Sequence, residues 1–423
     1  MTYTEIINYI ENATYDRTRL GLSRTVELCR LLGNPQDDLR FVHVTGSNGK
    51  GSVCAFLSSI LTEAGYRTGL YVSPQFEIFN DRMRICGENA ADEMIEKAGN
   101  AVVEAAKSME DHPSQFEMIT ALAFLLFKNE GCDIVVLEVG MGGETDSTNV
   151  IKNTEVAVIN NICLEHTEYL GNTIEEIARV KAGIIKPGCD VVVFNSSEDV
   201  IRVVKEKAGK HKAEIFVVEP QDFSMDEESG EGHIADADSR ISQIKSPLTG
   251  SFQKNNLVVA LKAVERLNAR KYNISEENIL NGIKKVRWPA RFEILREAPL
   301  FILDGGHNLQ CALAVRKTLA ANYGNERFVL LIGVLKDKDY EEEIKTLKDY
   351  VSRAVCITPE NGRALPAAEL SKICNQNGID AVACDTIEAG VKLAMSYDRP
   401  VLAFGSLYSA GRIRKAVLQM KDD

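Results

Sequence analysis

Short apolar runs and helical patterns alternate along most of the chain. Runs bounded by glycine or polar residues predict strands at 41–44, 68–74, 132–140, 154–162 and 189–194. Apolar positions at helical spacing predict helices at 4–11, 22–32, 52–61, 91–109, 115–128, 174–184, 257–267 and 276–285. Strands that alternate with helices form parallel sheets, which bind ligands outside the carboxyl ends of their strands. The pattern therefore predicts an α/β fold with a doubly wound, mostly parallel sheet.

The pattern is interrupted at residues 288–293, Trp-Pro-Ala-Arg-Phe-Glu, and then starts afresh. Further strands, separated by helices, are predicted at 300–303, 328–332, 354–357, 381–383 and 400–404. A chain of 423 residues exceeds what one hydrophobic core usually supports. We therefore expect two domains, 1–293 and 294–423. The acidic segment 219–240 is predicted to be a solvated loop or a weak hairpin.

Composition narrows the class of protein. A formal net charge of −12 argues against nucleic acid and against an anionic membrane surface as partners. Ten cysteines include no C-x-x-C pair, which favours reduced thiols packed as small hydrophobic groups over disulfides or a zinc site. The first residues are polar and amphipathic, and no apolar run is long enough to span a bilayer. These features predict a cytoplasmic protein.

A glycine-rich loop at residues 46–52, Gly-Ser-Asn-Gly-Lys-Gly-Ser, lies between the first predicted strand and the helix after it. Strand, glycine loop and helix form a phosphate cradle, because the backbone N–H groups turn inward at the positive end of the helix. Gly46, Ser47, Asn48, Gly49 and Gly51 supply this backbone; in addition, Lys50 can reach the outer phosphates and Ser52 can bind Mg²⁺. The spacing departs from the usual G-x-x-x-x-G-K-[ST], and a plain turn is the alternative.

Other candidates follow predicted strands. Glu138 ends an apolar strand, where it suits a metal ligand or a water-orienting group, although an ordinary salt-bridged glutamate is the alternative. His166 follows the next strand and is by itself a weak signal. Lys181, one helix later, is expected to face solvent. Asp304 ends the first strand after the junction, where a turn explains it equally well.

A second glycine-rich loop, 140–149, suits a polar small molecule, with loop plasticity as the alternative. From the residues alone, the first hypothesis is an ATP-dependent enzyme with a separate second domain. A nucleotide-driven switch or binding module is the second. An enzyme would turn over ATP only when its acceptor is added, whereas a switch would keep its nucleotide.

The ordered motifs resemble one known family nearly from end to end. They are Leu32-Gly-Asn-Pro, His43-Val-Thr-Gly-Ser-Asn-Gly-Lys-Gly-Ser, Ser73-Pro, Phe79-Asn-Asp-Arg, Glu138-Val-Gly-Met-Gly-Gly, Glu165-His-Thr-Glu-Tyr-Leu-Gly, Lys181-Ala-Gly-Ile-Ile-Lys-Pro, Trp288-Pro-Ala-Arg-Phe-Glu, Leu303-Asp-Gly-Gly-His-Asn, Gly333-Val-Leu-Lys-Asp-Lys-Asp and Gly405-Ser-Leu-Tyr. The chain resembles the folylpolyglutamate synthases and bifunctional dihydrofolate synthases of the Mur ligase superfamily.

The resemblance implies a P-loop-type ATPase domain with a doubly wound sheet, and a smaller Rossmann-like C-terminal domain. It implies that ATP phosphorylates the γ-carboxylate of a reduced folate and that L-glutamate then attacks the acyl phosphate. Magnesium ions and Lys50 would neutralise the charge on the transferring phosphoryl group. The expected partners are therefore small molecules, and we expect a monomer.

The resemblance also assigns residues. Two Mg²⁺ ions are implied, one held by Ser73 and Glu138 with the nucleotide phosphates, the other by His166. Lys181 matches a lysine that carbon dioxide carboxylates. Asn256, Arg291 and Asp304 match positions that contact ATP, and His307 matches a position near the glutamate or the acyl phosphate.

Two departures concern the pterin substrate. Gln75 stands where many relatives have histidine, and Glu144 stands where many have arginine. The resulting loop is similar to that of synthases with weak dihydrofolate synthase activity, so we favour reduced folates and keep dihydropteroate as a possible second acceptor. A peptidoglycan Mur-type amino-acid ligase is the less favoured reading, because only about forty residues precede the phosphate loop, too few for the UDP-sugar domain that such ligases usually carry.

Overall fold

The computed structural model describes residues 1–13, 21–220, 223–225, 232–234 and 246–420. Contacts divide the chain into two compact units, Met1–Pro247 with Lys254–Val286, and Leu248–Gln253 with Arg287–Asp423. The domain boundary at residue 293 stays a prediction. The two compact units meet at residues 286 and 287 instead, and the start of helix α9 (Ser251–Ala269) belongs to the second unit while the rest belongs to the first.

The first unit is built on an eight-stranded sheet with the order β4-β3-β2-β5-β1-β6-β7-β8. Six strands are parallel: β1 (Phe41–Thr45), β2 (Thr68–Tyr71), β5 (Ile134–Glu138), β6 (Thr154–Ile159), β7 (Asp190–Phe194) and β8 (Glu214–Val218). Strand β3 (Met83–Ile85) and the edge strand β4 (Glu88–Asn89) are antiparallel to their neighbours. The predicted doubly wound, mostly parallel sheet is confirmed.

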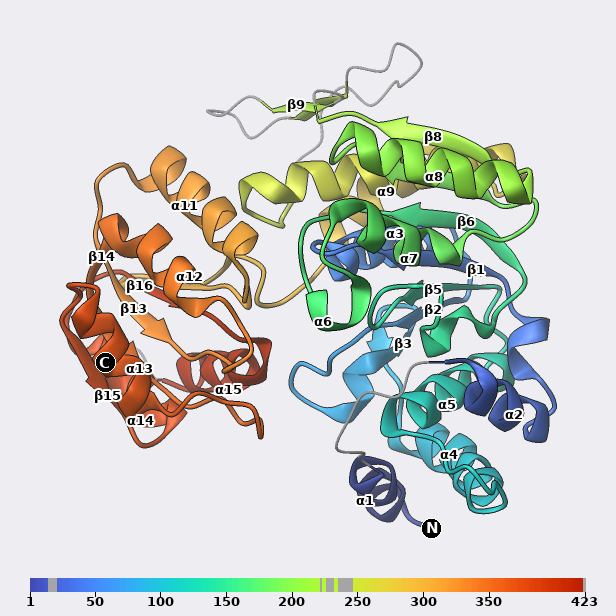
Figure 1. Ribbon diagram of the computed structural model, residues 1–423, viewed down its shortest axis with the longest axis horizontal. Helices are drawn as coiled ribbons and strands as arrows, with labels where there is room; N and C mark the ends of the chain where they lie inside the picture. The colour runs from blue at the N-terminus through green and yellow to red at the C-terminus, as the bar shows by residue number, and fades with distance from the viewer. Residues whose placement is uncertain (14–20, 221–222, 226–231, 235–245, 421–423) are drawn as a thin grey trace. The chain divides into compact units, whose positions relative to one another are not determined.

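Helices enclose this sheet (Figure 1). They are α1 (Tyr3–Asn12), α2 (Ser23–Leu31), α3 (Lys50–Glu63), α4 (Asp92–Lys107), α5 (Gln115–Asn129), α6 (Thr167–Leu170), α7 (Ile174–Lys181), α8 (Glu198–His211), most of α9 and α10 (Glu276–Lys285). One core cluster joins α1, α2, α4 and α5 to β1, β2 and β5, and a second joins α7 and α8 to β6 and β7. This order fixes the carboxyl ends of β5, β1 and β6 side by side, which is where the candidate residues lie.

The second unit has a six-stranded sheet with the order β11-β12-β16-β13-β14-β15. Its strands are β11 (Glu293–Glu297), β12 (Leu300–Leu303), β13 (Phe328–Ile332), β14 (Val351–Cys356), β15 (Ala381–Ala383) and β16 (Val401–Phe404), of which only β11 is antiparallel to its neighbour. Its helices are α11 (Leu309–Tyr323), α12 (Tyr340–Leu347), α13 (Ala367–Gln376), α14 (Ile387–Met395) and α15 (Leu407–Leu418). The predicted α/β architecture with a second, smaller unit is confirmed.

Some elements were not predicted. The β3–β4 hairpin and β11 carry charged residues among their apolar ones, so they lack the continuous apolar run of a buried strand. Strand β8 (Glu214–Val218) has such a run and was missed nonetheless. The predicted helix 174–184 is α-helical only to Lys181 and continues as the 3₁₀ turn η4 (Ala182–Ile184). Within the acidic segment, β9 (Phe223–Met225) and β10 (Gly232–Ile234) pair antiparallel, while most of its other residues lie outside the described ones.

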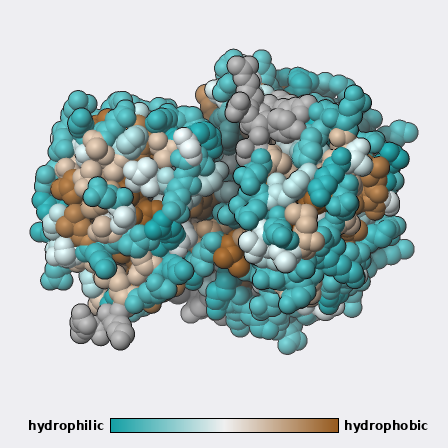
Figure 2. All heavy atoms as spheres, turned by 90° about the horizontal axis from the view of Figure 1, so that it is seen from below, coloured by the Kyte–Doolittle hydropathy of each residue, from teal (hydrophilic) through white to brown (hydrophobic). Residues whose placement is uncertain are grey.

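The character of the surface and the state of the cysteines agree with what the composition predicts. Figure 2 shows mostly hydrophilic residues on the visible face, with small apolar patches. All ten cysteines are free thiols, and seven are buried. Of the helices in the described part of the chain, none has the length and apolar content needed to cross a bilayer.

Candidate functional site

The phosphate loop joins the carboxyl end of β1 to the amino end of α3, as predicted. Gly49 precedes α3 with φ +79°, a left-handed conformation that favours glycine. A Cβ there would lie 2.1 Å from Asn256 Oδ1 and 2.5 Å from Asn160 Nδ2. Any side chain at this position would therefore collide with two polar groups that border the loop.

Asn160, directly after β6, organises the loop. Its Nδ2 donates to the Asn48 carbonyl at 3.0 Å and to Asn256 Oδ1 at 2.9 Å. Ser47 is anchored to the same chain segment, because its hydroxyl donates to the Cys163 carbonyl at 3.1 Å and accepts from the Cys163 N–H at 3.0 Å. Asn256 reaches this loop from α9. The first unit therefore places Asn256, which was expected to contact ATP, beside the phosphate loop.

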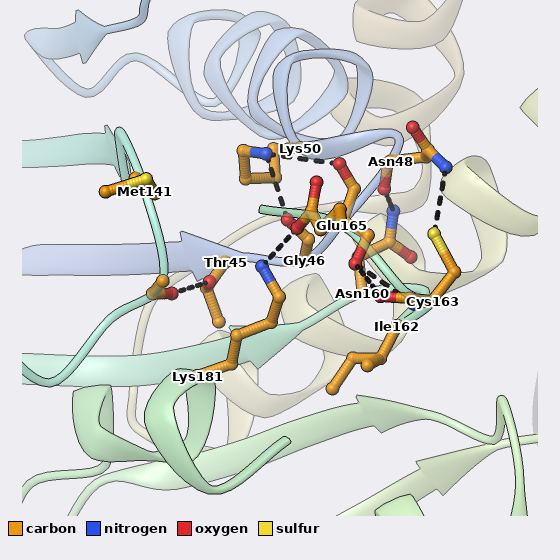
Figure 3. Close-up of polar contacts among 12 residues, drawn as sticks. Thr45, Gly46, Asn48, Lys50, Met141, Asn160, Ile162, Cys163, Glu165 and Lys181 are labelled. Atoms are coloured by element: carbon orange, nitrogen blue, oxygen red, sulfur yellow. Dashed lines mark hydrogen bonds and ion pairs between the residues drawn. The ribbon is translucent and has the colours of Figure 1, made fainter. Parts of the chain in front are cut away.

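Lys50 begins α3 and folds its side chain over the loop. Its Nζ donates to the carbonyls of Gly46 at 2.9 Å and Ser47 at 3.3 Å (Figure 3). The ammonium group therefore sits above the cradle, where it can exchange carbonyl partners for phosphate oxygens.

Ser52, Ser73 and Glu138 provide a test of the expected Mg²⁺ site. The Ser52 hydroxyl is buried, and no described residue accepts or donates a hydrogen bond to it. Glu138 is also buried, at the end of β5, and its Oε2 accepts from the Ser73 N–H at 3.3 Å. No group of three or more His, Cys, Asp or Glu side chains among the described residues is arranged to hold a metal. Hydroxyls and a single carboxylate fit Mg²⁺, which binds few protein ligands beside water and phosphate oxygens.

Lys181 is not solvent-facing, and that expectation is wrong. Its side chain is 1% exposed and its Nζ lies 2.7 Å from Glu165 Oε1 (Figure 3). Burial lowers the pKa of Lys181, and the Glu165 carboxylate opposes this effect. Burial would raise the pKa of Glu165, but Lys181 and Lys50 outweigh it and lower that pKa to about 2.

His166 lies next to this ion pair in sequence. It precedes α6 with φ 45° and is exposed. It is the neighbour of Glu165 in sequence, and its charge adds a small effect that lowers the pKa of that carboxylate. The carboxyl ends of β5, β1 and β6 thus gather Glu138, the phosphate loop, Glu165 and the histidine.

The loop at 140–149 runs beside the phosphate loop. The Thr45 hydroxyl, one residue before Gly46, donates to the Gly142 carbonyl at 2.6 Å. Glu144, the residue that departs from many relatives, pairs with Lys207 of α8 at 2.8 Å and is half exposed. Its negative charge is therefore balanced by a lysine from the first unit.

Three further candidates gather in the second unit, at the carboxyl end of β12. Asp304 is buried and its carboxylate accepts from the N–H groups of Phe292 at 2.8 Å and Gly306 at 2.7 Å. Burial raises the pKa of Asp304, and Arg291 and these two N–H groups oppose the rise. His307 Nδ1–H donates to the Gly305 carbonyl at 3.1 Å. Asp304 therefore fixes the turn that carries Arg291 and the one that carries His307.

Comparison with known proteins identifies the family. The model of the Mur ligase middle domain matches residues 44–264, and that of the Mur ligase, glutamate ligase domain matches residues 290–407. The dihydrofolate synthase/folylpolyglutamate synthase of Bacillus subtilis is 33% identical over 98% of this chain and 98% of its own length. This chain belongs to the folylpolyglutamate synthase family of Mur ligases.

Solved members of the family share the whole fold. The structure of E. coli FolC in complex with DHPP and ADP aligns with a TM-score of 0.88 at 28% identity, covering 99% of this chain and 98% of that one. A Mycobacterium tuberculosis folylpolyglutamate synthase complexed with ADP and AMPPCP aligns with a TM-score of 0.88 at 26% identity, covering 99% of each chain. The predicted membership of the folylpolyglutamate synthase family and the α/β fold in two units are confirmed.

Two polar residues of this family member were missed by sequence reasoning. Asn160 follows a buried strand and Glu165 precedes His166, so both carried the same signal that led to Glu138. No role was given to either, because their partners, Asn256 and Lys181, lie on later helices, and which residues of a helix reach a strand end is set by tertiary packing.

Proposed function

We propose that this enzyme joins L-glutamate to the γ-carboxylate of a reduced folate and converts ATP to ADP and phosphate in the same reaction. The observation that carries the proposal is the phosphate cradle that holds Lys50. Beside it lie the Glu138 carboxylate and the buried Ser52 hydroxyl, which has no hydrogen-bond partner among the described residues. The names of the relatives supply the acceptor and the reaction.

In the first step, a γ-carboxylate oxygen attacks the terminal phosphorus of ATP, and the bond to the ADP oxygen breaks. Lys50 and the loop N–H groups hold the phosphates and balance the charge that develops on them. The product is an acyl phosphate, in which phosphate has become a good leaving group. The amine of L-glutamate then attacks the carbonyl carbon, loses a proton and expels phosphate to form the amide.

Ser52, Ser73 and Glu138 would hold one Mg²⁺, and His166 would hold a second. Bound magnesium supplies charge neutralisation at the phosphoryl oxygens. Asn256, Arg291 and Asp304 are assigned to ATP, and His307 to the region of the glutamate or the acyl phosphate, by their positions in the family motifs.

Lys181 is assigned as a carboxylated lysine. The reaction joins the unprotonated amine to carbon dioxide and releases one proton, giving an anionic oxygen ligand. A buried amine whose pKa is lowered by burial suits this chemistry, since only the neutral amine is nucleophilic.

Dihydropteroate is the second candidate acceptor. It is favoured by relatives named dihydrofolate synthase and by the pairing of Glu144 with Lys207, which compensates the charge of that glutamate. We also propose that the enzyme acts as a monomer, which sedimentation of the purified chain tests.

Release of ADP from purified protein tests the proposed function. Tetrahydrofolate, 5,10-methylenetetrahydrofolate, dihydropteroate and a UDP-muramoyl peptide are each assayed with and without L-glutamate. We expect glutamate-dependent ADP release with a reduced folate and a product longer by one glutamate. Turnover with the UDP-muramoyl peptide alone would instead favour a peptidoglycan ligase, and nucleotide retained without turnover would favour a switch.

A further inference from the structure

A buried chain of hydrogen bonds ties β1 to the loop at 140–149. His43, two residues before Thr45 on the same strand, is fully buried, and its Nε2 lies 2.9 Å from the Thr148 hydroxyl. That hydroxyl donates to Asp146 Oδ1. Asp146 also accepts from the N–H groups of Thr148 at 3.0 Å and Met141 at 2.9 Å. The carboxylate thus holds both ends of the loop, and the histidine holds the carboxylate through one hydroxyl.

The direction of each hydrogen bond is fixed. A threonine hydroxyl has one proton, which here goes to Asp146, so the hydroxyl accepts the Nε2 proton of His43. His43 Nδ1 is then the unprotonated nitrogen, and no described residue is its hydrogen-bond partner. Burial, with a smaller effect of Lys186, lowers the pKa of His43 to about 3. The ring is therefore neutral and in one tautomer throughout the physiological range.

The loop at 140–149 also contacts helix α7, which carries Lys181. The Glu144 N–H donates to the Val180 carbonyl at 2.9 Å. Gly143 lies so close to α7 that a Cβ there would be 2.8 Å from the Lys181 carbonyl oxygen. The last turn of α7 is therefore packed directly on the loop that His43 and Thr45 hold.

We propose that the His43–Thr148–Asp146 chain is a positioning relay that sets the position of Lys181 relative to the phosphate loop. His43 and Thr45 face the loop from the strand that ends in Gly46, so one strand fixes both the phosphate cradle and the support of α7. His43 and Thr148 are positioning residues, since they touch no reacting atom. The catalytic part of this proposal rests on the proposed function.

Thr148→Val tests the relay, because valine keeps the shape of threonine and removes the hydroxyl. Thr148→Ser restores the hydroxyl and is the conservative rescue. Thr154→Val is the matched control: Thr154 is also buried in the first unit, at the start of β6, and its hydroxyl has no partner among the described residues. All variants are assayed well below their unfolding temperatures.

We expect Thr148→Val to lower kcat by about 10–100-fold, as the loss of an outer-shell partner does, while the KM for ATP and the Kd for ADP stay within about twofold. Thr148→Ser should recover most of kcat, and Thr154→Val should match the unsubstituted enzyme. A purely structural role would lower the unfolding temperature of Thr148→Val without this split. Unchanged kcat, equal losses in kcat and nucleotide affinity, or a serine variant as slow as valine would each overturn the proposal.

Hydrogen exchange gives a readout that does not depend on the reaction. Amides of α7 and η4, residues 174–184, should exchange faster in Thr148→Val than in the unsubstituted protein or in Thr154→Val. If the unsubstituted protein joins no glutamate to any folate, the proposed function fails. The hydrogen exchange of the α7 amides then decides by itself whether the His43–Thr148–Asp146 chain supports α7. Equal exchange in all variants would show that the relay does not support α7.

Discussion

Glu343 makes the second unit sensitive to pH. Its side chain lies in the first turn of α12, fully buried, and neither carboxyl oxygen has a hydrogen-bond partner among the described residues. Burial raises the pKa of Glu343 from 4.5 to about 8; Lys338 opposes the rise and Asp339 adds to it. Cys311 of α11, a neutral thiol, also lies within range of its charge. The carboxyl group is therefore protonated in the folded protein at neutral pH.

The sign of the effect follows from proton binding. Between about pH 4.5 and 8 the folded state keeps a proton that the unfolded state has released, so stability falls as pH rises through this window. Each pH unit within it costs about 1.4 kcal/mol, so the full loss above pH 8 approaches about 5 kcal/mol. That figure is an upper limit, because water that enters on ionisation would reduce it.

Glu343→Gln removes the ionisable group while it keeps nearly the same shape. From pH 6 to pH 8 we expect the free energy of unfolding of this variant to rise by about 2 kcal/mol relative to the unsubstituted protein, because Glu343 is already half ionised in the folded protein at pH 8. Urea unfolding at pH 6, 7 and 8 measures it, and Trp288, the only tryptophan, reports on the second unit, to which it belongs. Glu341→Gln is the control, because Glu341 is in the same turn and exposed. A difference that does not change with pH, or one that Glu341→Gln reproduces, would refute the reasoning.

Four further substitutions, the last of them a control, test the phosphate cradle and its surroundings. Lys50→Ala should abolish turnover and leave the circular dichroism spectrum unchanged, since the Lys50 ammonium group donates its hydrogen bonds to carbonyls of its own loop; near-normal turnover would remove Lys50 from the site. His166→Ala should also abolish turnover without unfolding the protein, because His166 is exposed. Measuring ADP release at increasing Mg²⁺ concentrations shows whether the variant has lost affinity for the metal. Gly49→Ala should weaken ADP binding at least about tenfold, because its Cβ meets Asn256 and Asn160. Gly188→Ala has a similar positive φ with nothing within 4 Å, so it should cost only about 1 kcal/mol of stability and leave calorimetric ADP binding unchanged.

The polar residues that follow buried strands could be predicted from sequence because strand ends are visible in the apolar pattern. Glu138 ends β5 and the phosphate loop follows β1, as the runs of apolar residues indicate. Since the carboxyl ends of parallel strands share one edge of a sheet, their proximity follows from topology alone.

The burial of Lys181 could not be predicted in this way. Lys181 follows Ile177 by four residues and Ala178 by three, so it lies on the apolar face of α7, whereas Arg179 does not and is about half exposed. A lysine on such a face usually extends its ammonium group to solvent, so the spacing alone does not predict burial of the charge. What decides its burial is the carboxylate of Glu165 and the packing of the loop at Gly143, both set by tertiary structure. Strand β11 was missed for a related reason, since it is partly exposed and pairs only with β12.

The unusual spacing of the phosphate loop has a physical explanation in its partners. A shorter loop offers fewer positions from which backbone groups can stabilise one another, so its conformation depends on outside contacts. Asn160 and Asn256 supply these contacts. The side-chain amide of Asn160 donates to the Asn48 carbonyl and to Asn256 Oδ1, and both side chains occupy the space beside Gly49 that a Cβ would fill. The information that makes Gly-Ser-Asn-Gly-Lys-Gly-Ser a phosphate cradle thus lies partly in two asparagines more than one hundred residues later in the chain. A loop motif of this kind is therefore recognised more securely by the polar residues at the neighbouring strand end and helix than by its own spacing.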